Sequence, residues 1–168
     1  KVRTISAFSY RMAVGKPFNH PNPNLSYCSN FLHMMFSEPY REYIPSRVVE
    51  KALALFLVLH ADHEQNCSTS TVRVVGSSRA NLFSSVASGV SALWGPLHGG
   101  ANTAVINMLE DMRTSGKPLD HYLDRAKDKD DDFRLMGFGH RVYKNFDPRS
   151  LILKKRVYKV LDELQKDD

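Results

Sequence analysis

Apolar residues recur every three or four positions along most of the chain, which is the spacing of one face of an α-helix. Residues 46–59 open with a serine suited to cap a helix and carry apolar side chains on all faces, so we expect a helix that is buried all round. Residues 80–94 and 101–112 also follow helical spacing, and we expect these two helices to pack as neighbours. The pattern predicts a mostly α protein.

Glycine and proline mark where the predicted helices end. Gly95 and Pro96 interrupt the pattern after residues 80–94, and the Ser-Gly-Lys-Pro sequence at residues 115–118 is a stop signal for the next helix. Turn residues and charge also delimit the remaining segments: a proline-rich loop at 19–24, a helix through 31–36, an acidic loop at 128–132 and a final amphipathic helix after Pro148. No segment has the alternating pattern of a β-strand.

Composition is that of an ordinary soluble globular protein. Among 168 residues, 42% are hydrophobic and 24% are charged, which excludes a disordered chain. The longest apolar run, residues 52–59, is far shorter than the roughly 20 residues that span a bilayer, and no signal peptide is recognisable, so we expect a cytoplasmic protein. Cys28 and Cys67 lack metal-ligand spacing and are expected to be reduced. The bare ends at Lys1 and Asp168 indicate a segment of a longer protein.

The balance of charge identifies no partner. The chain has 23 basic and 18 acidic residues, a net charge of +5, which suits an anionic ligand or a neighbouring subunit. Only Lys154, Lys155 and Arg156 are contiguous, and aromatic residues are not interleaved with the basic ones as a stacking platform requires. We therefore expect a solvated helix face here and no nucleic-acid interface.

One histidine stands among helix-breaking residues, in the sequence Gly95-Pro96-Leu97-His98-Gly99-Gly100. This pattern presents the imidazole of His98 at a turn that enters a new helix. The positive end of the helix dipole disfavours an imidazolium there, so we expect a neutral ring that donates a hydrogen bond to a developing oxyanion. Such a donor suits enolisation beside a thioester carbonyl. The alternative is that His98 only caps or packs the helix junction.

Two further histidines, His60 and His63, are three positions apart, with Glu64 next to them. On one helical face they would invite a metal ion, but the spacing matches neither zincin pattern and no third ligand is suggested, so we expect no metal site. We expect the helix to continue into the polar residues 66–71 and to line a wet cleft there. A buried, mutually hydrogen-bonded Ser/Thr layer is the alternative.

A third segment places cations after a glycine-flanked turn. Gly137-Phe138-Gly139 is followed by His140, then by Lys144 and Arg149. Arg149 can bind a carboxylate with two hydrogen bonds, whereas Lys144 is a mobile point charge better matched to phosphate. The turn lacks the preceding strand of a dinucleotide fingerprint. A plain loop with surface cations is the alternative.

In this order, the three histidine segments resemble citrate synthase, particularly its bacterial branch, and the resemblance covers essentially the whole chain. It implies condensation of acetyl-CoA with oxaloacetate, followed by thioester hydrolysis to citrate and CoA, with acetyl-CoA as co-substrate and no tightly bound cofactor. It also implies a two-domain helical fold of which this chain is a central fragment, with residues 1–98 in the large domain and 99–168 forming most of the small, CoA-side domain. As partners it implies a homodimer or hexamer, with neither nucleic acid nor a membrane.

The resemblance also implies roles for residues by motif position. His98 would hold the acetyl carbonyl, and His140 would polarise the oxaloacetate ketone and donate to it. His63 and Arg149 would bind oxaloacetate. The CoA contacts would come from the glycine turn and a following lysine: Leu135, Met136, Gly137, Phe138, Gly139 and Lys144. The general base of the family is an aspartate expected beyond the last residue, so no acid of this chain is assigned that role and the segment alone is not expected to turn over.

Two alternatives stay open. The first is a 2-methylcitrate synthase that uses propionyl-CoA, distinguished by room for one methylene near His98, a difference of only about 1 to 3 kcal/mol that makes mixed activity plausible. The second is a non-catalytic helical assembly module, against which the intact His63, His98, His140 and Arg149 argue. The sequence also does not decide between acetyl-CoA and propionyl-CoA or between a dimer and a hexamer. It does not show whether a nucleotide such as NADH inhibits the protein.

Overall fold

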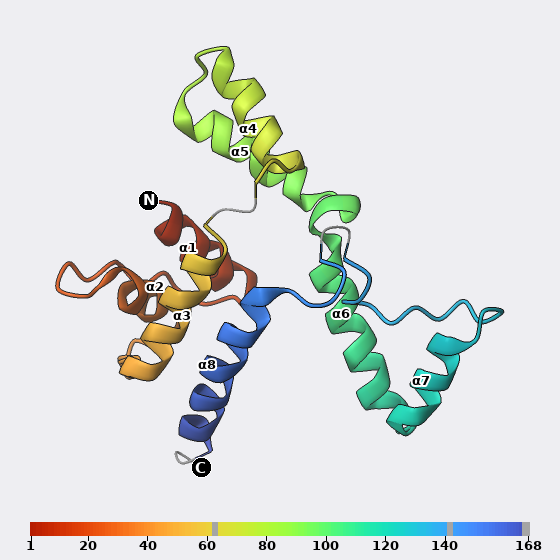
Figure 1. Ribbon diagram of the computed structural model, residues 1–168. Coiled ribbons are helices and arrows are strands. Elements are labelled where there is room, and N and C mark those ends of the chain that lie inside the picture. Colours follow the sequence, from red (N-terminus) through yellow and green to blue (C-terminus); the bar gives the residue numbers. More distant parts are fainter. Residues whose placement is uncertain (62–63, 141–142, 166–168) are drawn as a thin grey trace. The chain divides into compact units, whose positions relative to one another are not determined.

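The computed structural model describes residues 1–61, 64–140 and 143–165, and regular structure in these residues is almost entirely helical (Figure 1). An isolated β-bridge joins Glu38 and Arg41. The helices are α1 (Val2–Ala13), α2 (Tyr27–Phe36), α3 (Arg47–Leu59), α4 (Cys67–Ser77), α5 (Leu82–Trp94), α6 (Pro96–Ser115), α7 (Leu119–Lys127) and α8 (Pro148–Leu164). The predicted mostly α fold is confirmed.

Contacts between residues divide the chain into two compact units. Unit 1 is Lys1–Asp62 with Phe146–Asp168, and unit 2 is His63–Asn145. This division concerns contacts within these 168 residues and does not test the predicted domain boundary at residue 98. That boundary stays a prediction.

Unit 1 is a set of helices joined pairwise, α1 with α2, α2 with α3, and α3 with α8. A fully buried arginine, Arg11 of α1, organises the end of α2. Its Nε donates to the Pro17 carbonyl at 2.7 Å, and its Nη1 donates to the carbonyls of Met35 and Ser37 at 3.1 and 2.8 Å. The last carbonyls of a helix have no partner within it, so Arg11 supplies the missing donors.

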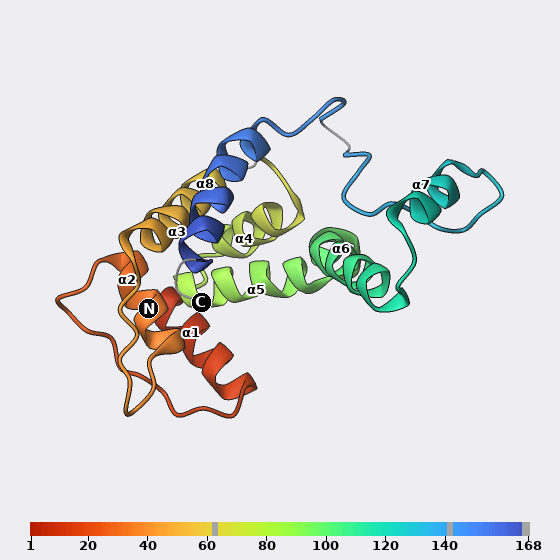
Figure 2. The ribbon, with the colours of Figure 1, turned by 90° about the horizontal axis from the view of Figure 1, so that it is seen from below.

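Unit 2 is built on the pair α4 and α5, which lie side by side (Figures 1 and 2). Asparagine begins each helix: the side chains of Asn66 and Asn81 accept from the backbone N–H groups of Thr69 and Ser84. Gly95 alone separates α5 from α6 and has an extended conformation. Residues 80–94 and 101–112 lie in successive helices that are in contact, as expected, although α5 packs more extensively along α4 than against α6.

The end of α6 follows the glycine and proline signals in the sequence. Gly116 closes the helix with a φ of 67°, in the left-handed region that glycine adopts without strain. Pro118 then precedes the short helix α7, which the apolar spacing does not predict. The glycine turn at 115–118 is confirmed, and α7 is an addition to the predicted elements.

Two expectations about the first apolar helix are wrong. No residue of α3 is buried, and Val58 is 69% exposed. In the part of unit 1 that the structure describes, this helix packs mainly against α2 and α8, which leaves much of its surface uncovered. The helix also does not continue into residues 66–71. It ends at Leu59 with His60 as its C-cap, and Asn66 starts a new helix by bonding to the Thr69 N–H with its side chain. Side-chain capping by Asn66 therefore outweighs continuity of the helical pattern.

Within the described ranges, no helix is both long and apolar enough to cross a membrane.

Candidate active site

His98 lies in the first turn of α6, as the glycine and proline pattern predicts. The ring reaches α4, where the backbone N–H of Ser68 donates to His98 Nε2 at 3.3 Å. The Ser68 hydroxyl oxygen lies 3.0 Å from the same nitrogen and 2.9 Å from Asn66 Oδ1. The hydroxyl has one proton, which it can donate to either of these two acceptors. His98 is therefore fixed by the start of a second helix.

These contacts assign the tautomer of His98. A backbone N–H can only donate, so Nε2 accepts, and a neutral ring then carries its proton on Nδ1. Both helices present their positive ends here, since His98 is in the first turn of α6 and Ser68 is in the first turn of α4. The imidazole thus lies between the starts of two helices, and in its neutral form the ring donates from Nδ1.

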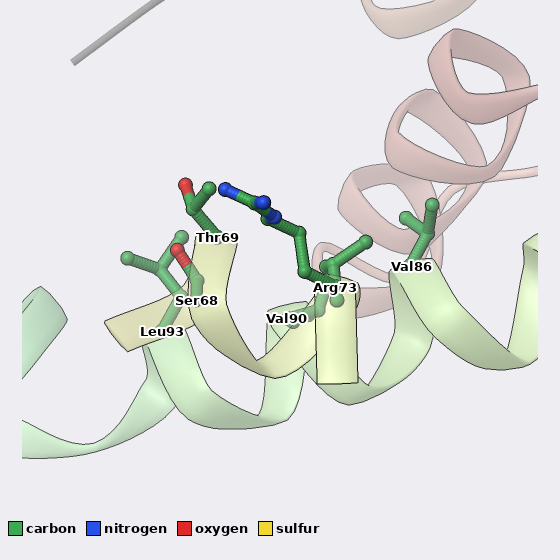
Figure 3. Close-up of a pocket in the computed structure, with 8 residues that line it drawn as sticks. Ser68, Thr69, Arg73, Val86, Val90 and Leu93 are labelled. Carbon is green, nitrogen blue, oxygen red and sulfur yellow. The ribbon is translucent and has the colours of Figure 1, made fainter. Parts of the chain in front are cut away.

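Two residues of the polar stretch that opens α4 line a pocket, whereas a wet cleft along residues 66–71 stays a prediction. Ser68 and Thr69 form part of a hollow of about 380 Å³ between α4 and α5 (Figure 3). The other lining residues are mainly apolar and include one arginine: Val72, Arg73, Val86, Gly89, Val90 and Leu93. Ser68 therefore both lines this pocket and contacts the imidazole of His98.

The turn predicted to contact CoA requires both of its glycines. Gly137 and Gly139 have φ values of 90° and 76°, which other residues rarely adopt. The turn rests on α6, where the Met136 N–H donates to Met108 Sδ at 3.2 Å. Phe138 is 76% exposed, so the turn presents an aromatic ring to solvent.

His140 follows this turn and is fixed by the next described residue. The backbone N–H of Tyr143 donates to His140 Nδ1 at 3.2 Å, and the two rings lie 4.9 Å apart. A neutral His140 therefore carries its proton on Nε2. His98 and His140 both belong to unit 2 and are fixed through opposite ring nitrogens.

Arg149 belongs to unit 1, at the start of α8. Its guanidinium pairs with Asp147, with Nη2 at 2.6 Å and Nε at 3.0 Å from the carboxylate oxygens. Its Nη1 donates to the Leu59 carbonyl at the end of α3. Lys144 is exposed, and His63 lies outside the described residues.

Sequence reasoning missed the ion pair between Arg125 and Asp131 in unit 2. Asp131, within the acidic run expected to be a solvated loop, accepts two hydrogen bonds from Arg125 at 2.7 and 2.9 Å. These bonds, with a third from the Phe133 N–H, lower the pKa of the Asp131 carboxyl to about 2. The Arg125 guanidinium also lies 4.9 Å from the centre of the Phe133 ring. The spacing of six between Arg125 and Asp131 carries no local signal, because it matches no helical repeat.

A second hollow, of about 430 Å³, lies between α6, α7 and the segment that leads to the glycine turn. Tyr122, Arg125, Phe133, Arg134 and Met136 are among its lining residues. No group of three or more histidine, cysteine or acidic side chains that could hold a metal ion is found in residues 1–61, 64–140 and 143–165.

Comparison with known families decides the relationship. The family model described as citrate synthase, C-terminal domain, matches residues 1–168. This chain belongs to the citrate synthase family. The family inferred from the three histidine segments is thereby confirmed, as is the helical fold, whereas the bacterial branch stays a prediction.

Solved citrate synthases agree. The enzyme from Pyrobaculum aerophilum is 41% identical with a TM-score of 0.81, and the match covers 98% of this chain and 39% of that one. The enzyme from Thermotoga maritima MSB8 is 34% identical with a TM-score of 0.70, covering 94% and 41%. The enzyme from the archaeon Thermoplasma acidophilum, solved as a ternary complex with carboxymethyl coenzyme A and oxaloacetate, is 31% identical with a TM-score of 0.76, covering 98% and 41%. The chain thus spans about two-fifths of these citrate synthases.

Proposed function

We propose that the protein containing this chain condenses acetyl-CoA with oxaloacetate and hydrolyses the resulting thioester to citrate and CoA. The observation that carries the proposal is the fixed tautomer of His98, whose Nε2 accepts from the Ser68 N–H. Family membership and the ternary complex of the Thermoplasma acidophilum relative support the same substrates.

His98 acts in the first step. A base removes a proton from the acetyl methyl group, and negative charge develops on the thioester oxygen. The Nδ1–H of His98 donates to that oxygen as the enolate forms, which stabilises the transition state more than the ground state. We assign the base to no residue of this chain.

His140 acts in the second step. The enol carbon attacks the ketone carbon of oxaloacetate, so that a carbon–carbon bond forms and the ketone oxygen becomes an alkoxide. His140 polarises the ketone from Nε2 and gives its proton to that oxygen, a role supported by the acceptor character of Nδ1. Water then cleaves the citryl thioester, releasing CoA and citrate.

The remaining roles concern substrate binding. We assign His63 and Arg149 to oxaloacetate, since a guanidinium matches a carboxylate with two hydrogen bonds. We assign CoA to residues 135–139 and Lys144, supported by the exposed Phe138 ring and the exposed lysine. Acetyl-CoA is the co-substrate in this scheme, and no tightly bound cofactor is needed.

The same proposal includes a homodimer or hexamer in the cytoplasm. Large apolar side chains remain exposed on α4 and α5, among them Val74 at 70%, Leu82 at 72% and Trp94 at 88%. An apolar face of this kind is typical of a surface buried by another chain or segment. Cys28 and Cys67 are both free thiols, which suits a reducing compartment.

The proposal is tested by CoA release. The protein at its full natural length is supplied with oxaloacetate and either acetyl-CoA or propionyl-CoA, and His98→Ala is compared with His20→Ala, a histidine in a loop of unit 1. We expect acetyl-CoA turnover that falls by at least about 100-fold in His98→Ala, as for loss of an oxyanion donor, and that persists in His20→Ala.

Other outcomes have distinct meanings. A clear preference for propionyl-CoA would identify a 2-methylcitrate synthase with the same machinery. Absence of thiol release with either substrate would overturn the enzymatic proposal and leave the assembly module.

A further inference from the structure

Gly89 of α5 packs closely against α4. It is buried, and a methyl group in its place would overlap Cγ2 of Val72 and lie 3.5 Å from the Ser68 carbonyl oxygen. Val72 is one turn after Ser68 on α4, so the glycine faces the turn that holds His98. The close contact between α4 and α5 at Gly89 therefore lies next to the contact between Ser68 and His98.

The overlap cannot be relieved by a simple rotation of Val72. A β-branched side chain in a helix is held in one strongly preferred rotamer, so a methyl group at Gly89 would push the helices apart. By contrast, Gly76 of α4 has room, because a methyl group there would be 3.8 Å from Ser85 Oγ. Two glycines of the same helix pair thus differ in whether they tolerate a side chain.

We propose that Gly89 is a positioning residue for His98. The proposal rests on the citrate synthase reaction proposed above and adds a residue that touches neither substrate nor the reacting atoms.

The link from Gly89 to His98 is short and stiff. Gly95 is the single residue between α5 and α6, and His98 follows in the first turn of α6. Gly99 packs against the carbonyl group of Leu93, where no side chain fits, so α5 and the start of α6 move together. A displacement of α5 at Gly89 is carried through this junction to the imidazole.

The hydrogen bond from the Ser68 N–H to His98 Nε2 is too long to survive such a displacement. The Ser68 nitrogen is already 3.3 Å from Nε2, at the long end for an N–H donor, so a shift of a few tenths of an ångström removes the bond. The Ser68 hydroxyl, 3.0 Å from the same nitrogen, can accept as well as donate, so without the backbone bond the proton is no longer confined to Nδ1. The donor to the enolate oxygen is lost, although the residues assigned to oxaloacetate are unchanged.

Four proteins at full natural length test this inference: wild type, Gly89→Ala, Gly89→Ala with Val72→Ala, and the matched control Gly76→Ala. We expect Gly89→Ala to lower kcat at least about tenfold, because small misplacements of catalytic groups have large effects on rate. The KM for oxaloacetate should stay within about twofold, since its binding residues are untouched. The double variant removes the overlapping methyl group and should regain most of the lost kcat, and Gly76→Ala should match wild type.

A spectroscopic readout separates positioning from general destabilisation. Nitrogen-15 NMR of histidine-labelled protein reports which ring nitrogen of His98 carries the proton. We expect a single Nδ1–H tautomer in wild type and Gly76→Ala, a tautomer mixture in Gly89→Ala, and the single tautomer again in the double variant. If Gly89→Ala does not fold, Val72→Ile provides a milder change at the same crossing, with the same direction expected for kcat and tautomer.

Three results would overturn the inference: an unchanged kcat in Gly89→Ala, a double variant that stays impaired, or a fall in kcat with the His98 tautomer unaltered. Absence of citrate formation by wild type would instead overturn the proposed function. In that case the tautomer comparison alone still decides whether Gly89 positions His98.

Discussion

Arg149 forms a two-point ion pair with Asp147, the residue that caps its own helix. Asp147 also accepts from the Arg149 backbone N–H, so one carboxylate fixes both the start of α8 and the guanidinium. Pro148 between them is the first residue of the helix, where a proline is tolerated. The guanidinium is thus oriented by the backbone as well as by charge.

This relationship predicts that Arg149→Lys weakens oxaloacetate binding. Lysine keeps the charge but loses the planar, two-point geometry. A charged hydrogen bond contributes about 1.5 to 3 kcal/mol, so we expect the KM for oxaloacetate to rise about 10- to 100-fold. Steady-state kinetics with Arg134→Lys, an exposed arginine of unit 2, as the control should show no such rise. An equal effect of both changes would argue against a specific carboxylate contact.

Local signals in the sequence account for most helix ends. The Asp-Pro-Arg sequence at 147–149 and the Ser-Gly-Lys-Pro sequence at 115–118 mark a helix start and a helix stop, because capping and turn formation involve near neighbours. Asn66 is a similar signal, and its capping overrides the expected continuation of the helix into residues 66–71.

Partners that depend on packing could not be predicted in this way. Ser68 is 30 positions from His98, and their contact exists only because α4 and α5 lie side by side. The ion pair of Arg125 with Asp131 is likewise set by the loop that follows α7. The exposure of α3 also differs from the sequence pattern, since burial depends on which segments cover a face and not on its composition.

The Ser68 hydroxyl is expected to make a smaller contribution than the Ser68 backbone. Ser68→Ala removes the contact between Oγ and His98 Nε2 but keeps the donating N–H. A hydrogen bond contributes about 1 kcal/mol net, so kcat should fall only about fivefold. Ser70→Ala, whose hydroxyl accepts from Gln65, is the matched control and should leave kcat unchanged. A loss as large as that of His98→Ala would contradict assignment of the tautomer to the backbone N–H.

Alanine variants of Gly139 and Gly15 should distinguish backbone strain from a role in CoA binding. Gly139 and Gly15 have φ values of 76° and 68°, and no atom of the described residues lies within 4 Å of the position that a side chain would take at either residue. Alanine at each position should therefore destabilise the protein by about 1 to 2 kcal/mol through backbone strain alone. Only Gly139→Ala should also raise the KM for acetyl-CoA, because residues 135–139 are assigned to CoA. Thermal unfolding and steady-state kinetics on both variants make the comparison, and an equal KM effect would remove the turn from the CoA site.

The pair of Arg125 and Asp131 should make stability depend on pH in the acidic range. The pKa of Asp131 is lowered from 3.8 to about 2 in the folded protein, so the unfolded chain takes up the proton first as the pH falls. The stabilisation is fully present above pH 3.8 and is lost as the pH approaches 2. Asp131→Asn should therefore have a lower melting temperature than wild type at pH 6, and the difference should close near pH 2. Asp130→Asn, an exposed acid of the same run, should show no difference at either pH. If the melting temperature of Asp131→Asn stayed below that of wild type at low pH, packing of the loop, and not the ion pair, would hold the loop to α7.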